Sequence, residues 1–316
     1  MTSEQQLGAI RAAPGIIRVH GHRGARGILP ENSLEGFAFT FSADVRVVEL
    51  DLLVTADHIP VITHNPQLMS ASTRGADGKW LCEDGPLISE CTFAELQTFD
   101  IGGLRPGSEY GQRYPDQVFL SGIRIPGFDS LCQLIRDDDL DDVWLNIEIK
   151  SDPRFPANTP EIPEYVADIL KPIFASKLED RVILQSFDWR VLHECERQAP
   201  QISRSYLSYI PKPNAPLAVN IYEGSPWMDG LSLEEHRNSL PRVVAHAGGQ
   251  VWSPFFEDLT AEDMQMARNE GLVVNVWTVN ERADIEHMID LGVDGIITDY
   301  PGRVQRCLLE HGLSWK

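Results

Sequence analysis

A histidine and an arginine stand side by side in a glycine-rich turn near the start of the chain. His22 and Arg23 lie in the segment HGHRGARGILPEN, which follows the apolar run 16–19. Because glycine lets the backbone turn tightly, we expect a short strand, a turn, and then a helix capped by Asn32 or Ser33. Arginine offers a planar fork of donors to phosphate, and histidine exchanges a proton near neutral pH. The pair therefore suits chemistry on a phosphate ester.

Acidic side chains occupy two strand-like segments farther along the chain. In VVELDLLV, alternation places Glu49 and Asp51 on one face, and in NIEIK it does the same for Glu148 and Lys150. Three carboxylates without cysteine favour Mg²⁺ or Ca²⁺ over zinc. The alternative for the first two acids is a structural ion network with Lys150 or Arg23. The third carboxylate, Glu148, makes the metal site the preferred interpretation.

Three further side chains are candidates on weaker grounds. His64 ends the extended run IPVITH and could act as acid or base with His22, although a lone histidine is more often structural. Lys150 either binds phosphate or pairs with a carboxylate. Trp277 lies near the end of a predicted strand, where core packing is the default and a place in a substrate pocket requires a barrel. The sequence has no P-loop, G-x-G-x-x-G, H-E-x-x-H or G-x-S-x-G motif, so serine-based hydrolysis has little support.

The bulk composition limits the class of partner. The chain has 316 residues, a net charge of -20 and five scattered cysteines without a C-x-x-C motif. The charge argues against non-specific binding of nucleic acid and against docking on anionic membranes, and the cysteines indicate neither a structural zinc site nor a disulfide framework. The N-terminal segment matches neither a signal peptide nor a membrane helix. We therefore expect a cytoplasmic protein without stable membrane insertion, whose phosphate site is locally cationic or contains a metal.

Eight strand-like segments alternate with helix-like segments. This alternation predicts a (β/α)8 TIM barrel, with an open doubly wound sheet as the alternative. The run 59–64 follows the second strand too closely for a parallel crossover, so we expect an antiparallel hairpin there. The eight strands are predicted to begin at Ile16, Arg46, Trp144, Val182, Ser203, Val243, Val273 and Gly295.

One segment interrupts the alternation. Residues from about 65 to 124 are rich in Gly, Pro, Ser and Asp and contain one short helical pattern at 92–96. A structureless loop of this length is unusual in a compact domain. We therefore predict a single barrel domain over residues 1–316, with a small inserted cap at about 65–124 after the second strand.

The candidate residues lie where predicted barrel strands end. His22 and Arg23 end the first strand, the paired acids end the second, and Glu148 and Lys150 end the third. Asp299 follows the last strand. In a barrel these C-terminal ends share one face, which is where active sites are built. The sequence therefore predicts one site that contains all of these groups.

These segments resemble the glycerophosphodiester phosphodiesterase family. The resemblance spans almost the whole chain in family order and implies a (β/α)8 barrel with a small insertion after the second strand, in agreement with the independent analysis above. The matching stretches are HRGARGILPENSLEGF at 22–37, VVELDLLVTADHIPVITHN at 47–65, NIEIK at 146–150, LQSFD at 184–188, NVWTVN at 275–280 and GVDGIITDYP at 292–301.

The resemblance also implies a role for each candidate. It assigns the general base to His22, the general acid to His64, phosphate contacts to Arg23 and Lys150, the alcohol side to Trp277, and one divalent cation, Mg²⁺ or Ca²⁺, to Glu49, Asp51 and Glu148. The chain departs from the family pattern at Asn65, where the family usually has Asp, and at IPGFDSL before the second helix. If that Asp orients or charges the histidine, His64 is a weakened acid here.

The function implied is metal-dependent hydrolysis of a small-molecule glycerophosphodiester to sn-glycerol 3-phosphate and an alcohol. The attacking group is either water or the glycerol 2-hydroxyl, which would pass through a cyclic phosphate. The nearest alternative is a lysophospholipase D-like enzyme of the same fold that acts on a lipid. An alternative of another class is a phosphodiester-binding protein without turnover, against which His22, His64 and the three carboxylates speak.

Overall fold

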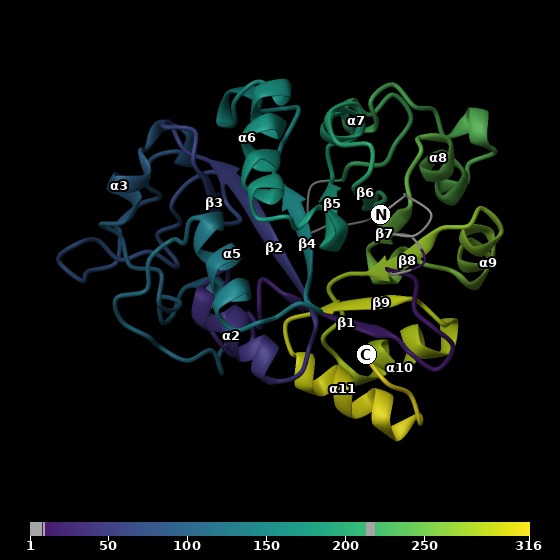
Figure 1. Cartoon of the computed structure of the whole chain (residues 1–316), viewed down its shortest axis with the longest axis horizontal. Coiled ribbons are helices and arrows are strands. Elements are labelled where there is room, and N and C mark those ends of the chain that lie inside the picture. Colours follow the sequence, from purple (N-terminus) through teal and green to yellow (C-terminus); the bar gives the residue numbers. More distant parts are fainter. Residues whose placement is uncertain (1–7, 9, 213–218) are drawn as a thin grey trace.

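The computed structural model describes residues 8, 10–212 and 219–316. Within these residues, eight parallel strands close into a barrel, because each strand pairs with the next and the last pairs with the first (Figure 1). The predicted barrel is confirmed, and the open doubly wound sheet is excluded. In barrel order the strands are β1 (Arg18–His22), β2 (Val47–Val54), β4 (Trp144–Ile149), β5 (Val182–Ser186), β6 (Ser203–Ser208), β7 (Val251–Pro254), β8 (Val273–Val276) and β9 (Gly295–Thr298).

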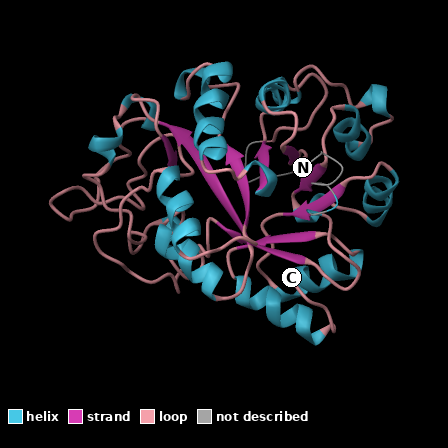
Figure 2. Cartoon of the chain, viewed as in Figure 1, coloured by secondary structure: helices cyan, strands magenta, loops and turns pink. Residues whose placement is uncertain are grey.

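Helices surround the strands on the outside (Figure 2). On α6 (Ile162–Ala175) the apolar side chains Val166 and Ile169 are fully buried, and the Tyr165 hydroxyl lies 3.0 and 2.8 Å from the carbonyl oxygens of Leu52 and Lys150. This helix therefore also ties together the C-terminal ends of β2 and β4. None of the helices among the described residues has the length and apolar content needed to cross a membrane. The barrel helices are α2 (Leu34–Ser42), α5 (Phe128–Asp137), α6 (Ile162–Ala175), α7 (Trp189–Gln198), α8 (Leu240–His246), α9 (Ala261–Asn269), α10 (Arg282–Leu291) and α11 (Pro301–Glu310).

The predicted start of the seventh barrel strand is wrong. Val243 lies in α8, and the seventh barrel strand is β7, which begins at Val251. Pro241 occupies the first turn of α8, where its missing N–H leaves no helical hydrogen bond unmade, and Gly248 takes a left-handed φ of +73° just after the helix. The apolar pair Val243 and Val244 is buried on a helix that covers the barrel, not on a strand. The other predicted starts agree with the structure to within two residues.

A hairpin leads the chain out of the barrel after β2. The short strand β3 (Pro60–Ile62) pairs antiparallel with β2, with Val61 opposite Leu53. This pairing confirms the predicted hairpin. The chain then continues to α5 through a region that lies beside β2 and β3 and consists mainly of loop (Figures 1 and 2).

This region, where the sequence predicts a cap, carries η1 (Ile88–Glu90), α3 (Phe93–Leu96) and α4 (Glu109–Arg113). Its apolar side chains Ile88 and Leu96 are buried in the same cluster as Leu50 of β2. The segment is thus packed on the barrel. The division into one domain with a cap at about 65–124 stays a prediction.

Candidate active site

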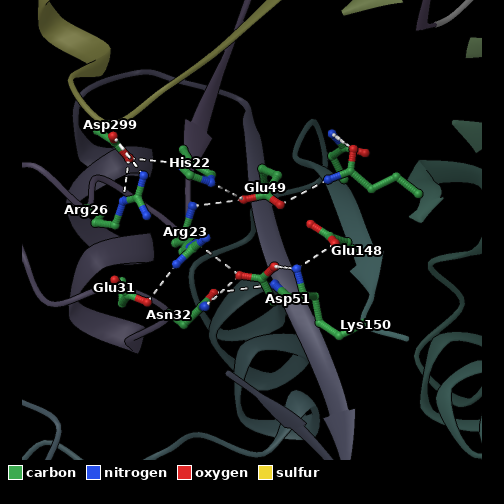
Figure 3. Close-up of polar contacts among 12 residues, drawn as sticks. His22, Arg23, Arg26, Glu31, Asn32, Glu49, Asp51, Glu148, Lys150 and Asp299 are labelled. Atoms are coloured by element: carbon green, nitrogen blue, oxygen red, sulfur yellow. Dashed lines mark hydrogen bonds and ion pairs between the residues drawn. The ribbon is translucent and has the colours of Figure 1, made fainter. Parts of the chain in front are cut away.

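Three carboxylates converge at the C-terminal end of the barrel. Glu49 and Asp51 come from β2 and Glu148 from β4, where the strand register places Asp51 opposite Glu148. One oxygen of each carboxylate lies within 4.8 Å of the others, and all three side chains are buried. Figure 3 shows the three groups turned toward one another. The alternation of the strands therefore brings these acids together as the sequence predicts.

The three buried carboxylates repel one another. Burial, together with the charges of Asp51 and Glu148, raises the pKa of Glu49 well above its usual range. Burial also raises the pKa of Glu148 to about 7, although Lys150 opposes the rise. Burial alone would raise the pKa of Asp51, but the charge of Arg23 lowers it below its usual range. A cation between the three groups would relieve the repulsion without a proton.

The donor set fits a hard divalent cation. All three ligand groups are carboxylates, which suit Mg²⁺ or Ca²⁺. Oδ1 of Asp51 is buried and has no hydrogen-bond partner among the described residues, although the Lys150 ammonium lies 3.7 Å away. If all of the acidic and basic groups around it were ionised, they would include two more carboxylates than cations, an imbalance that one divalent cation would offset. These groups are Glu31, Glu49, Asp51, Glu148 and Asp299 against Arg23, Arg26 and Lys150.

His22 is held at the end of β1 by a buried aspartate. Its Nδ1 lies 2.7 Å from Oδ1 of Asp299, and its Nε2 lies 3.7 Å from Oε2 of Glu49. Asp299 also accepts hydrogen bonds from Nε and Nη2 of Arg26 at 2.8 and 3.0 Å, and from Asn280 at 2.7 Å. Burial and the charge of Arg26 lower the pKa of His22 to about 4. The ring is therefore neutral near pH 7, with its proton on Nδ1 and the Nε2 lone pair toward the acidic cluster.

Arg23 is fixed between two acids in the turn after β1. Its Nη1 donates to Oε1 of Glu31 at 2.9 Å, its Nε lies 3.2 Å from Oδ2 of Asp51, and its backbone N–H donates to Oε2 of Glu49 at 3.1 Å. The residue has a left-handed φ of +50°, and Gly24 follows with φ +87°. A Cβ at Gly24 would lie 2.9 Å from the backbone of α2, so the turn requires glycine there.

Asn32 and Ser33, which the sequence offered as alternative helix caps, have different roles in the structure. Ser33 is the helix cap, since its side chain accepts a hydrogen bond from the backbone N–H of Gly36 at 3.1 Å. Asn32 takes a left-handed φ of +54° and donates to Oδ2 of Asp51 at 2.9 Å. Asn32 therefore orients one of the three carboxylates.

Lys150 and His64 are the two remaining candidates for contact with the phosphodiester. The Lys150 ammonium pairs with Glu148 at 2.6 Å, as one of the two predicted alternatives requires. His64 follows β3, and its Nδ1 lies 2.8 Å from Oδ1 of Asn65. Burial and the charges of Arg23 and Lys150 lower the pKa of His64 well below its usual value. Because Asn65 is neutral, it orients the ring without the negative charge that an aspartate would add.

Trp277 follows β8 and stands in an aromatic group at the same end of the barrel. Its Nε1 donates to the carbonyl oxygen of Ser253 at 2.8 Å, and the ring is 8% exposed. It meets Phe187 edge to face with ring centroids 5.2 Å apart, and the Lys150 ammonium lies 6.0 Å from the Phe187 centroid. Trp277 is thus mostly buried, but Phe187 connects it to the charged cluster.

Several supporting residues escaped the sequence analysis. Gln185 donates to Oε1 of Glu49 at 3.0 Å. It lies opposite Glu148 in the strand register, so the alternation of β5 could have identified it. Arg26 lies in the same glycine-rich turn as His22, so its place in the sequence could also have identified it. No pattern pointed to Glu31 or Asn280, whose contacts depend on the folded chain.

The fold and the site define an enzyme: a closed parallel barrel that presents a buried acidic cluster, cations and a neutral histidine at the end where barrel enzymes react. The family model described as the glycerophosphoryl diester phosphodiesterase family matches residues 22–303. The chain belongs to this family, and it is accordingly a phosphodiesterase.

Individual relatives agree with this assignment. A solved structure from Silicibacter pomeroyi, of a protein assigned as a glycerophosphoryl diester phosphodiesterase, is 44% identical with a TM-score of 0.88 and covers 100% of both chains. The glycerophosphodiester phosphodiesterase of Caldanaerobacter subterraneus is 27% identical over 90% of this chain and 94% of its own. A phosphodiesterase of Oleispira antarctica, solved with the product sn-glycerol-3-phosphate, is 24% identical with a TM-score of 0.66, over 93% of this chain and 97% of its own.

Proposed function

We propose that this protein hydrolyses small glycerophosphodiesters to sn-glycerol 3-phosphate and an alcohol, with one divalent cation, Mg²⁺ or Ca²⁺, held by Glu49, Asp51 and Glu148. The observation that carries the proposal is the cluster of these carboxylates with ligand atoms within 4.8 Å of one another, beside Arg23 and His22. The product found in the Oleispira antarctica relative supports the glycerol side of the substrate. When bound, the cation would polarise the phosphoryl group and lower the pKa of the attacking hydroxyl.

The side chains of the site would bind the phosphate and move two protons. Arg23 and Lys150 would donate hydrogen bonds to phosphoryl oxygens. Nε2 of His22 would accept the proton of the attacking hydroxyl, from water or the glycerol 2-hydroxyl, as the new O–P bond forms. His64 would give a proton to the alcohol oxygen as the old P–O bond breaks.

The low pKa of His64 fits this role once substrate is bound. The positive charges of Arg23 and Lys150 contribute to lowering it. Burial is the largest cause of the low pKa and would remain, but the negative charge of a bound phosphodiester would offset the two cations, so the pKa of His64 would rise. The histidine would then hold its proton until the alcohol needs it.

The remaining predicted contacts concern the leaving group. We place Trp277, with Phe187, along the alcohol side of the substrate, since these rings extend from Lys150 across the end of the barrel. Residues from about 65 to 124 would form the cap of a single-domain enzyme, because they lie between β3 and α5 and carry side chains that reach the turn after β1, residues 22–31, here called the catalytic turn.

Product analysis tests the proposed function. Purified protein with Mg²⁺ or Ca²⁺ is incubated with glycerophosphocholine, glycerophosphoethanolamine, glycerophosphoglycerol and lysophosphatidylcholine, and the products are identified by ³¹P NMR. We expect sn-glycerol 3-phosphate from the three water-soluble diesters. Turnover of lysophosphatidylcholine alone would favour the lipid alternative, and no turnover of any diester would favour the binding protein.

Asp299→Asn is expected to lower kcat by about 10- to 150-fold, because a hydrogen bond to a charged group typically contributes about 1.5–3 kcal/mol. Asp299 accepts the Nδ1 proton of His22 and so leaves Nε2 free as a base. An asparagine can present its N–H₂ group instead and favour the other tautomer. The ¹⁵N shifts of the His22 ring should therefore change with kcat. A fall in kcat without a change of tautomer would show that Asp299 does not act by setting the tautomer of His22.

A further inference from the structure

One tyrosine of the segment between β3 and α5 contacts both sides of the catalytic turn. Tyr110 lies in α4, and its hydroxyl donates to Oε2 of Glu31. The same hydroxyl oxygen accepts a hydrogen bond from Nη1 of Arg26 at 3.3 Å. Burial raises the pKa of Tyr110 above its usual range, so the hydroxyl keeps the proton that it donates.

The contact with Glu31 leads to the phosphate side of the site. Glu31 binds Arg23 through Oε1, at 2.9 Å from Nη1, while Tyr110 binds Oε2. The tyrosine thus fixes one oxygen of a carboxylate whose other oxygen fixes the arginine. Among the described residues, the guanidinium of Arg23 donates a side-chain hydrogen bond from Nη1 and none from Nη2, so Nη2 is a donor that remains for a phosphoryl oxygen.

The contact with Arg26 leads to the histidine side, but there the tyrosine hydroxyl is one support among several. Arg26 already binds Asp299 through two nitrogens, and its guanidinium lies 4.6 Å from the ring centroid of Tyr114. Glu31 has fewer supports, and its side chain is 16% exposed. Removal of the Tyr110 hydroxyl should therefore disturb Glu31 and Arg23 more than it disturbs His22.

We propose that Tyr110 is a positioning residue through which the inserted segment sets the orientation of Arg23 for phosphate binding. With the hydroxyl in place, Glu31 holds one edge of the guanidinium and presents the other to the substrate. Without it, Glu31 is free to rotate, and its charge competes with the phosphate for the arginine. The affinity for substrate then depends on a residue that need not touch the substrate. The inference rests on the proposed function, in which Arg23 binds the phosphate.

Tyr110→Phe removes the hydroxyl and keeps the ring, which packs edge to face on Tyr114 with centroids 5.5 Å apart. Tyr114→Phe is the matched control, because its ring also contacts Arg26 but its hydroxyl has no hydrogen bond among the described residues. With glycerophosphocholine as substrate, we expect Tyr110→Phe to raise KM about 10-fold and to change kcat less than about 2-fold. Tyr114→Phe should change neither more than about 2-fold.

A double-mutant cycle separates this path from a general structural effect. If the hydroxyl acts through Glu31, the Tyr110→Phe change should add less than about 2-fold to KM in a Glu31→Gln background. Full additivity of the two changes would overturn the inference. So would equal KM values for Tyr110→Phe and Tyr114→Phe, or a fall in kcat at unchanged KM.

The affinity for inorganic phosphate tests the inference independently of turnover. Calorimetry in the presence of Mg²⁺ gives the Kd of phosphate for the wild type and for both tyrosine variants, and we expect a weaker Kd in Tyr110→Phe alone. If the wild type releases no sn-glycerol 3-phosphate, the proposed function fails while the phosphate result still stands. Equal Kd values in the three proteins, or no phosphate binding by the wild type, would overturn the role of Tyr110.

Discussion

In excess EDTA, hydrolysis of glycerophosphocholine is expected to fall to background and to return when Mg²⁺ or Ca²⁺ is added. The physical reason is the buried cluster of Glu49, Asp51 and Glu148, whose mutual repulsion raises the pKa of Glu49 and Glu148. Without a divalent cation the repulsion is relieved mainly by protons, and a protonated carboxyl does not supply the Lewis acidity by which a metal ion activates the attacking hydroxyl. The measurement is the initial rate over a titration of each metal after chelation. Full activity in excess EDTA would rule out the metal.

Glu49→Gln should raise the metal concentration needed for half-maximal rate, because it removes one of three charged ligands. Glu35→Gln is the matched control, since Glu35 is an exposed carboxylate on α2 outside the site. Binding must be followed without turnover as well. A ligand at about 100 times its Kd stabilises a protein by about 2.7 kcal/mol, so the unfolding midpoint of the wild type should rise with Mg²⁺ or Ca²⁺. The same concentration should have a smaller effect on Glu49→Gln, and equal shifts in both proteins would contradict the ligand assignment.

The barrel could be predicted because most of its strands are short, apolar and bounded by turns. Seven of the eight predicted starts fall within two residues of a barrel strand. The eighth fails at Val243, where a pair of β-branched residues favours a strand. A helix forms there because Pro241 favours the first turn of a helix and Gly248 favours its end. Both valines are buried on the helix face that covers the barrel. Local propensity is a weaker determinant than burial at such a position.

The acidic cluster could also be predicted, because the side chains of a strand alternate with a period of two and parallel strands keep a fixed register. Strand alternation alone places Glu49 and Asp51 on one face. The fixed register of parallel strands is also required to bring Glu148 beside them. The contacts around Arg23 follow neither rule. Glu31 and Tyr110 are separated by 79 positions and meet only because α4 folds back over the turn after β1. Such contacts depend on the path of the inserted segment, for which the sequence carries no periodic signal.

The loss of kcat/KM in His64→Ala is expected to increase with the basicity of the departing alkoxide. General acid catalysis typically contributes about 10²–10⁴-fold. Choline leaves as a strongly basic alkoxide unless it is protonated, so His64→Ala should cost most of that range in kcat/KM on glycerophosphocholine. Nitrophenolate leaves readily without a proton, so bis(4-nitrophenyl) phosphate should lose far less. His22→Ala should harm both substrates similarly, because either reaction needs an activated nucleophile.

The measurement is kcat/KM for both variants on both substrates, with folding and metal content checked for each protein. His58→Ala is the matched control, because His58 lies in the exposed turn between β2 and β3 and pairs with Asp168. It should leave both substrates within about 2-fold of the wild type, as surface substitutions away from a site usually do. The neutral Asn65 beside His64 does not prevent the effect, since in the doubly protonated ring its Oδ1, 2.8 Å away, would accept a hydrogen bond from Nδ1 and leave the Nε2 proton for the alcohol. Equal losses from His64→Ala on the two substrates would mean that this histidine is not the general acid. The opposite pattern, with His22→Ala selective for glycerophosphocholine, would exchange the two roles.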